Sequence, residues 1–249
     1  VEAWPDAAEE VAVLLSGGVD SSVALALLLD QGERCRAFYL RVWLEDEQAS
    51  AAKGECPWEE DWAYASATCA HLGVPLEPVS LQREYSDQVV SYLLREVAAG
   101  RTPNPDVMCN SRVKFGAFYE RVGRHFKRVA SGHYAQLARG AGPDAAVQLR
   151  ASADAHKDQT YFLSQLSQEQ LRAAAFPIGG YTKAQVRSLA QRYGLPTVAR
   201  GDSQGICFLG RVNYDEFLRS HLGESSGELR ELESGELIGT HRGLCYHTI

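Results

Sequence analysis

The chain has 249 residues, of which 45% are hydrophobic and 23% charged, and its formal net charge at pH 7 is −7. This size and composition are typical of a soluble globular protein with one large domain or two smaller ones. No run approaches the roughly 18 apolar residues of a membrane span, and the acidic residues 1–10 do not resemble a targeting peptide. The net charge argues against general nucleic-acid affinity, although residues 101–128 carry seven Lys or Arg against two acidic residues.

The six cysteines include no C-x-x-C pair. This argues against a structural zinc site and, at this chain length, against a disulfide-stapled scaffold. Free thiols in a reducing compartment are therefore predicted.

Strand and helix patterns alternate along most of the chain. Strands are predicted at 11–15, 36–41, 76–81 and 127–131, and helices at 20–29, 60–72, 83–99, 113–126, 167–174 and 182–193. Residues 43–60 and the two-proline stretch 101–105 are predicted to be loops, and 134–151 a hairpin. The alternation predicts an α/β fold with a doubly wound, mostly parallel sheet, whose ligands bind beyond the carboxyl ends of the strands.

From about residue 212 the chain changes to short segments separated by glycines, which predict a small β-rich module. We therefore expect an N-terminal tail (1–10), a nucleotide-binding catalytic domain (11–211) and part of a β-rich domain (212–249).

The string S-G-G-V-D-S-S at residues 16–22 lies where the first strand meets the first helix. Glycines let the backbone approach an anion, and the helix N-terminus and serine hydroxyls supply donors to phosphate. Because the string lacks the lysine of a Walker A loop, it instead resembles the pyrophosphatase loop of enzymes that split ATP into AMP and pyrophosphate. The alternative is a glycine turn that merely joins strand to helix.

Two cysteines lie in polar segments that the pattern predicts to be loops. Asp106 precedes Cys109 by three residues, just ahead of a basic helix, and Cys207 follows D-S-Q-G-I. A carboxylate there could act as general base, and a cysteine near cations and a helix N-terminus favours its thiolate. Taken singly, each is more often an inert buried thiol. Beside an adenylation loop, the two together indicate sulfur transfer.

These strings, with T-P-N-P-D-V-M-C-N at 102–110, G-H-Y at 132–134, K-D-Q-T-Y-F-L at 157–163 and G-L-C-Y-H-T-I at 243–249, resemble the tRNA-specific 2-thiouridylases. The resemblance implies an ATP-pyrophosphatase core of the adenine nucleotide alpha hydrolase type. It implies ATP-dependent adenylation of the C2 oxygen of the anticodon wobble uridine in tRNA, followed by sulfur transfer to give 2-thiouridine. It further implies an upstream persulfide donor protein, Mg²⁺ with the ATP, no membrane, and a C-terminal barrel-like domain that this chain lacks.

The resemblance also implies roles for individual residues. Cys207 would carry the persulfide, Cys109 would release the sulfur through a Cys109–Cys207 disulfide, and Asp106 would contact the base and assist proton transfer. The nucleotide would be bound by Leu14, Leu15, Ser16, Gly17, Gly18, Val19, Asp20, Ser21, Ser22, Leu40 and Gly132. The tRNA would be met by Asn104, Pro105, Asp106, His133, Lys157, Asp158 and Gln159. The compartment would be the cytoplasm of a bacterium, or a mitochondrion or plastid of a eukaryote.

Plain structural explanations exist for several of these residues. Gly132 alone could be a turn after a strand, His133 a core histidine, and 157–159 a solvated helix start. Two rival functions also share the pyrophosphatase loop: a synthetase with an amine nucleophile, and a nucleotide-binding module without catalysis. Neither gives Cys109 and Cys207 a role, and loss of activity on Cys→Ser substitution would separate them from sulfur transfer.

Overall fold

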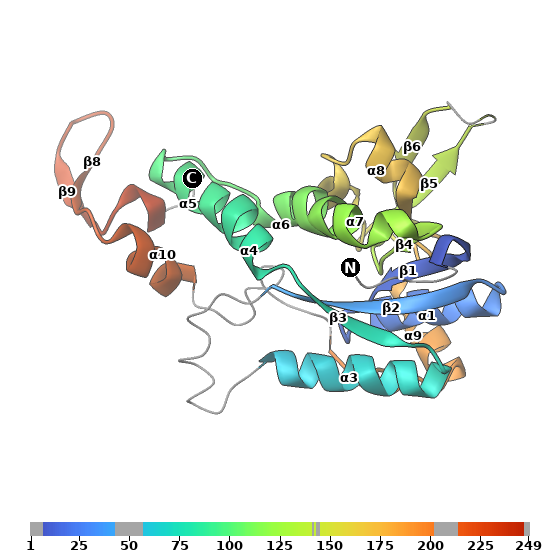
Figure 1. Cartoon of the computed structure of the whole chain (residues 1–249). Helices are drawn as coiled ribbons and strands as arrows, with labels where there is room; N and C mark the ends of the chain where they lie inside the picture. Colours follow the sequence, from blue (N-terminus) through green and yellow to red (C-terminus); the bar gives the residue numbers. More distant parts are fainter. Residues whose placement is uncertain (1–6, 43–56, 141, 143–144, 202–213, 247–249) are drawn as a thin grey trace.

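The computed structural model describes residues 7–42, 57–140, 142, 145–201 and 214–246. Its centre is a five-stranded parallel sheet with strand order β3-β2-β1-β4-β7 (Figure 1). The strands are β1 (Glu10–Leu14), β2 (Arg34–Arg41), β3 (Leu76–Ser80), β4 (Arg128–Ala130) and β7 (Ala174–Ala175). The sheet confirms the predicted α/β fold.

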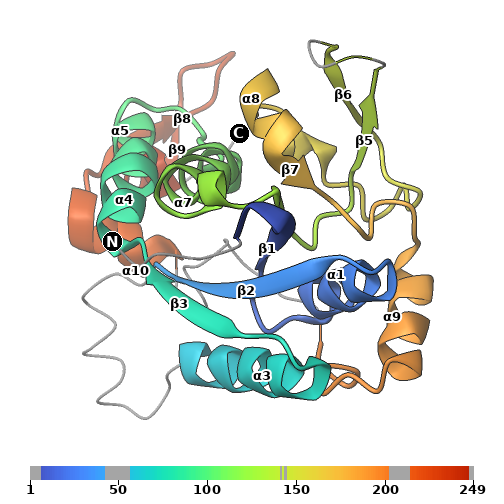
Figure 2. The same cartoon turned by 45° about the vertical axis from the view of Figure 1, so that its right-hand side comes forward.

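Helices cover both faces of this sheet (Figures 1 and 2). One layer contains α1 (Val19–Asp30), α3 (Pro57–Leu72) and α9 (Lys183–Arg192). The other contains α4 (Gln82–Tyr85) and α5 (Ser91–Ala98), joined by a π-helical turn at Ser86–Val90, and α6 (Pro105–Met108) and α7 (Phe118–Arg121), joined by a π-helical stretch at Cys109–Ala117. Short 3-10 turns lie at Ala7–Glu9, Gly123–His125, Thr160–Leu163 and Leu244–Tyr246.

Strand β1 shows why its apolar run is continuous rather than alternating. Ala12 and Leu14 pack into the cluster that includes the layer of α4 to α7, whereas Val11 and Val13 pack with α1 and α3. A strand buried on both faces needs apolar residues at every position. The continuous apolar run thus fits the central position of β1 in the sheet.

Two smaller antiparallel pairs complete the described chain. The hairpin β5 (Gln136–Arg139) and β6 (Val147–Arg150) matches the hairpin predicted at 134–151, and α8 (Gln168–Ala173) follows it. After α10 (Tyr214–Leu222), strands β8 (Gly227–Arg230) and β9 (Leu237–His241) form a second hairpin. The division of the chain at residue 211 stays a prediction.

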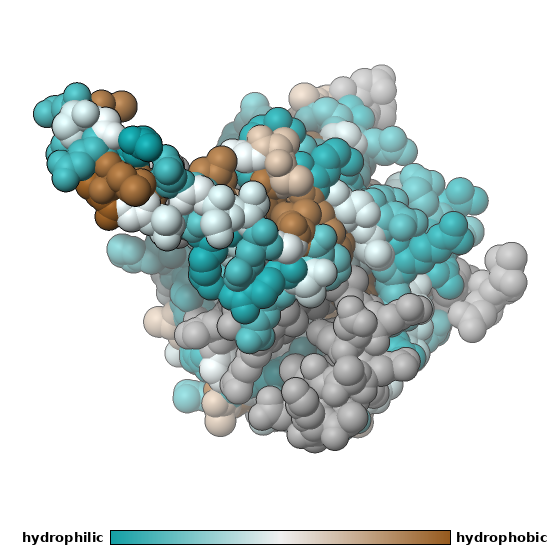
Figure 3. All heavy atoms as spheres, turned by 90° about the vertical axis from the view of Figure 1, so that its left-hand side faces the viewer, coloured by the Kyte–Doolittle hydropathy of each residue, from teal (hydrophilic) through white to brown (hydrophobic). Residues whose placement is uncertain are grey.

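The second hairpin projects from the body of the molecule and exposes apolar side chains (Figure 3). Leu229, Leu237 and Ile238 are 46%, 52% and 68% exposed. Helix α10 instead joins the main core through Phe217 and Leu218, which are buried with α5. Among the described residues, no helix is long and apolar enough to cross a bilayer.

Four sequence predictions about element boundaries are wrong. The helix predicted at 113–126 belongs to a helical run that begins at Pro105 and ends at Arg121. The loop predicted for 43–60 and the one for 101–105 both extend too far, because α3 begins at Pro57 and α6 at Pro105. Proline is well tolerated at the first helical position, where its missing N–H has no partner to lose. The helix predicted through residue 174 ends at Ala173, and the next two residues form the edge strand β7.

Candidate active site

The S-G-G-V-D-S-S string forms the turn from β1 into α1, at the carboxyl end of the central strand. Gly17 has a φ of +78°, in the left-handed region that favours glycine. Ser21 and Ser22 donate their hydroxyls to the Gly18 carbonyl at 3.1 and 2.8 Å. Gly18 is the N-cap of α1 and has no side chain to bond the first N–H groups of the helix. The turn therefore presents a helix N-terminus and the exposed Ser16 hydroxyl to an anion.

The turn lies at the point where the strand order reverses. The chain proceeds from β1 outward to β2 and β3, and then returns to the other side of β1 to form β4. Doubly wound sheets bind ligands at such a switch point. Predicted nucleotide residues Leu14, Leu15 and Leu40 are buried around this edge, and Val19 is buried in the first turn of α1. They form the apolar support of the turn.

Gly132 follows β4 and packs directly on the turn. A Cβ atom at this position would lie 2.6 Å from the Ser21 nitrogen and 2.8 Å from the Asp20 carbonyl carbon. Real Cβ atoms do not approach backbone this closely, so a side chain would push the two segments apart. The structure thus brings Gly132 and the S-G-G-V-D-S-S turn together, as the sequence analysis expected.

We expect Gly132→Ala to lower nucleotide affinity by about tenfold or more and stability by about 1–3 kcal/mol, because overpacking displaces the turn. Calorimetric titration with an ATP analogue and denaturant unfolding would measure the two effects. Gly180→Ala is the matched control, since a Cβ there meets nothing within 4 Å. Equal behaviour of the two variants would contradict the close-packing argument.

An ammonium group reaches this turn from a distant helix, which the sequence analysis missed. Lys183, the first residue of α9, places Nζ 2.8 Å from both carboxylate oxygens of Asp20. The Tyr134 hydroxyl donates to the same carboxylate at 2.8 Å. Thr182 caps α9 through a capping box, so the sequence did predict where this helix begins. The absence of a lysine within the turn is the signal that could have prompted a search for one elsewhere.

Asp106 and Cys109 lie in a helix rather than in the predicted proline-stiffened loop, and this part of the prediction is wrong. Asn104 is the N-cap, and its side-chain oxygen accepts from the Asp106 and Val107 N–H groups at 3.1 Å each. Pro105 occupies the first helical position. Asp106 is half-buried in the first turn, and Cys109 lies one turn later with 1% exposure. Asp106 can thus face a ligand, whereas the Cys109 thiol is inside the core.

The start of this helix contacts the 3-10 turn at Thr160–Leu163. The Asn104 amide donates to the Tyr161 hydroxyl at 3.4 Å, and the Asn110 amide donates to the Phe162 carbonyl at 3.0 Å. Tyr161 is 62% exposed. An exposed ring beside Asn104 and Asp106 offers a surface on which a nucleobase could stack.

His133 lies between this helix and the S-G-G-V-D-S-S turn at residues 16–22, called the nucleotide turn below. Its ring contacts Phe115 and Phe176, at centroid distances of 6.5 and 5.9 Å, and its Nδ1 is 2.7 Å from the Ser131 hydroxyl. Burial, and secondarily the charge of Lys114, hold the pKa of His133 well below 6.5. The imidazole is therefore neutral at pH 7, with one ring nitrogen that donates and one that accepts a hydrogen bond.

The low pKa of His133 predicts a pH effect on stability. Below pH 6.5 the histidine is protonated in the unfolded state but stays neutral in the folded state. The free energy of unfolding therefore falls as the pH falls, by at most about 1.4 kcal/mol per pH unit. Denaturant unfolding between pH 7.5 and 5.5 would measure the slope. His133→Asn, which can still bond Ser131, should remove part of it. An identical slope in the variant would contradict the assignment.

The K-D-Q string at 157–159 divides into an exposed and an internal part. Lys157 is exposed. Asp158 accepts from the Ser152 N–H at 2.6 Å and from the Thr160 N–H at 3.1 Å, and Gln159 accepts from the Tyr134 N–H at 3.0 Å. Asp158 thus braces the segment internally, and Gln159 holds it against Tyr134, whose hydroxyl donates to Asp20. The string connects the candidate base-binding surface to the nucleotide turn.

Two further cysteines, Cys35 and Cys69, are buried free thiols like Cys109. Cys207 and the predicted Cys109–Cys207 pair lie outside the described residues. Burial, aided by nearby Glu33 and Glu10, raises the pKa of Cys35 to about 12, and burial alone raises that of Cys69 to about 11. Both thiols therefore stay protonated and weakly nucleophilic at neutral pH.

The residues at the turn do not form a ready site for the expected Mg²⁺. In the described part of the chain, no three His, Cys, Asp or Glu side chains gather to hold a metal ion. Asp20 is the carboxylate of the turn, and both of its oxygens already contact Lys183. We therefore assign the metal no protein ligand.

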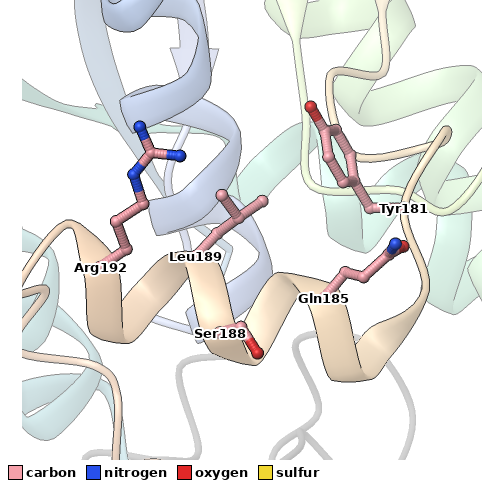
Figure 4. Close-up of a pocket in the computed structure, with 5 residues that line it drawn as sticks. All are labelled: Tyr181, Gln185, Ser188, Leu189 and Arg192. Carbon is pink, nitrogen blue, oxygen red and sulfur yellow. The ribbon is translucent and has the colours of Figure 1, made fainter.

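A shallow hollow along α9 is separate from this region (Figure 4). It is lined by Tyr181, Gln185, Ser188, Leu189 and Arg192. None of these was predicted as a site residue; Tyr181 precedes α9, and the other four lie along it.

Comparisons with known proteins bear on these observations. The tRNA methyl transferase HUP domain family matches residues 9–211. The tRNA-specific 2-thiouridylase MnmA 2 of Bacteroides fragilis is 46% identical over 96% of this chain, and MnmA of Porphyromonas gingivalis is 45% identical over 96%. The chain spans about two thirds of the length of these relatives, 66% and 65% respectively.

Among solved structures, the NMN synthetase of Francisella tularensis shares the fold, with a TM-score of 0.51 and 17% identity over 84% of this chain and 72% of that one. The match over 9–211 covers the whole parallel sheet and the turn at its switch point. The chain belongs to the tRNA-specific 2-thiouridylase family.

Proposed function

We propose that residues 11–211 form the catalytic domain of a tRNA-uridine 2-sulfurtransferase. In this reaction ATP adenylates the C2 oxygen of the wobble uridine, and a persulfide sulfur then replaces the activated oxygen. The products are 2-thiouridine, AMP and pyrophosphate. The observation that carries the proposal is the S-G-G-V-D-S-S turn at the switch point of the sheet, connected through Tyr134 and Gln159 to the segment beside Asn104 and Asp106.

The nucleotide is proposed to bind with its phosphates at the turn. Donors from the first turn of α1 and from Ser16 bind phosphate oxygens, and Lys183 neutralises the Asp20 carboxylate that would otherwise repel them. Pyrophosphate is then a well-stabilised leaving group, because its developing charge faces a helix N-terminus and an ammonium. Mg²⁺, when bound with the phosphates, would neutralise further charge.

The uridine is proposed to bind near Asn104, Pro105 and Asp106. Asp106 is half-buried, and its neighbour in the chain Asn104 donates to the hydroxyl of the exposed Tyr161, so we place a stacked uracil where Asp106 can accept its N3 proton. Removing that proton makes the C2 oxygen a better nucleophile toward the α-phosphate of ATP. Neutral His133 and exposed Lys157 are proposed to contact the tRNA at the edges of this surface.

The sulfur step is proposed to use both predicted cysteines. The terminal sulfur of a Cys207 persulfide attacks C2 and displaces AMP, which leaves the base joined to Cys207 through a disulfide. The Cys109 thiolate then attacks the Cys207 sulfur, releases the sulfur on the base, and forms a Cys109–Cys207 disulfide that a reductant must reopen. Because Cys109 is 1% exposed, the helix around it has to open for this step.

The test is sulfur transfer by the full-length protein. Unmodified tRNA, ATP, Mg²⁺ and a persulfide donor are supplied, and 2-thiouridine is measured by mass spectrometry for the parent, Cys109→Ser and Cys207→Ser. We expect product from the parent and none from either variant. Cys35→Ser is the matched control, since Cys35 is buried at the amino end of β2, the opposite end of the sheet from the turn. Pyrophosphate release without thiolated tRNA, unchanged in both variants, would instead favour a synthetase with another nucleophile.

A further inference from the structure

Arg200 makes an unusual set of contacts with the nucleotide turn and with α3. Its NH1 donates to the Gly17 carbonyl at 2.7 Å, and its NH2 forms an ion pair with Asp61. Its guanidinium lies 4.7 Å from the centre of the Tyr64 ring. The Arg200 side chain is 18% exposed and that of Asp61 is 31% exposed, so the pair is largely shielded from water. One guanidinium thus joins the turn to the first two turns of α3.

The contact with Gly17 determines the orientation of one peptide plane. In a trans peptide the carbonyl of one residue and the N–H of the next point in opposite directions. Because the Gly17 carbonyl points toward Arg200, the Gly18 N–H must point away from it. That N–H donates to the hydroxyl of the exposed Ser16 in a long bond of 3.4 Å. The Arg200 contact therefore turns the Gly18 N–H to the exposed side of the turn, where a phosphate oxygen can replace the Ser16 hydroxyl as its acceptor.

The wall behind this peptide is tightly packed. A Cβ atom at Gly17 would lie 2.3 Å from the Asp61 carbonyl oxygen and 2.9 Å from the Arg200 NH1. The backbone of Arg200 is itself held, because Arg187 donates to its carbonyl at 2.8 Å. Arg200 is thus held both at its guanidinium and at its backbone. The Gly17–Gly18 peptide packed against it has little room to rotate.

We propose that Arg200 is a positioning residue that holds the Gly17–Gly18 peptide with its N–H directed at a bound phosphate, and that Asp61 acts by orienting Arg200. The inference rests on the proposed nucleotide site. Arg200 need not touch the nucleotide itself. It fixes the donor before ligand binds, so that binding does not have to order the turn.

The experiment measures binding of α,β-methylene-ATP by calorimetry for the parent, Arg200→Gln, Arg200→Lys and Asp61→Asn. We expect Arg200→Gln to weaken binding by about tenfold or more, because a charged hydrogen bond to a fixed carbonyl is lost. Arg200→Lys, which can still donate to Gly17, should recover part of the affinity. Asp61→Asn should weaken binding in the parent and have little further effect in Arg200→Gln. Arg192→Gln is the matched control, because Arg192 is exposed at the C-terminal end of α9, the end opposite Lys183.

A second readout separates positioning from general loss of structure. With glycine-selective ¹⁵N labelling, the Gly18 amide signal should shift on addition of pyrophosphate in the parent and shift much less in Arg200→Gln, at equal thermal stability. Parent-like affinity and an equal Gly18 shift in Arg200→Gln would overturn the inference. A parent protein that binds neither the analogue nor pyrophosphate would instead overturn the proposed nucleotide site.

Discussion

Replacement of Lys183 by methionine is expected to lower the rate of pyrophosphate release by about a hundredfold, which corresponds to about 3 kcal/mol. Methionine keeps most of the side-chain length and removes the charge. The Asp20 carboxylate would then be unpaired beside the phosphates, and its negative charge would repel theirs. The Lys183 side chain is 15% exposed and that of Asp20 31%, so water screens the pair only in part. The rate of pyrophosphate release at saturating ATP, measured for each variant, tests this expectation.

Three variants separate the role of this charge from a role in folding. Lys183→Arg keeps the positive charge and should retain more activity than Lys183→Met. Asp20→Asn in the Lys183→Met background should recover part of the lost rate, because the repelling carboxylate is gone. Lys127→Met removes a lysine of similar type that pairs with Glu33 away from the turn, and it should leave the rate unchanged. A rate in Lys183→Met equal to the parent rate would contradict the assignment.

The contact between Lys183 and Asp20 could not be predicted from the sequence, although the elements that carry the two residues could. The turn was predictable because strand, glycines and helix follow one another within a dozen residues. The start of α9 was predictable because Thr182 and Gln185 form a capping box. Their meeting was not predictable, since the two residues are 163 positions apart in the chain. Only the packing of α9 against α1 brings the ammonium to the carboxylate.

The helix that begins at Pro105 illustrates a different kind of error. The prolines at 103 and 105 predict a loop, yet Asn104 followed by Pro105 is also typical of a helix start. The same residues fit both interpretations, and the Asn104 cap decides between them. Strand β7 is a third case. Two alanines carry no β-strand signal, and their pairing with β4 alone defines the strand.

Asp106 lies in the first turn of α6, and we expect its substitution to affect catalysis rather than folding. Asp106→Asn is expected to lower the rate of 2-thiouridine formation by about a hundredfold to ten-thousandfold, since a general base is lost. The side chain that caps this helix is Asn104, so the variant should leave stability nearly unchanged. ATP binding should also be unchanged, because the turn at 16–22 supplies the phosphate contacts. Single-turnover thiolation, calorimetric ATP titration and denaturant unfolding measure the three quantities.

Glu120→Gln is the matched control for Asp106→Asn, because Glu120 is a 68% exposed carboxylate at the far end of the same helical run. A general base also leaves a signature that a structural residue does not. The Asp106→Asn rate should rise with pH as solvent hydroxide takes over proton removal, whereas a misfolded site would stay inactive at every pH. If Asp106→Asn weakened ATP binding and thiolation equally, the carboxylate would serve the nucleotide rather than the base. Proton removal at the uridine would then have to be assigned to another group.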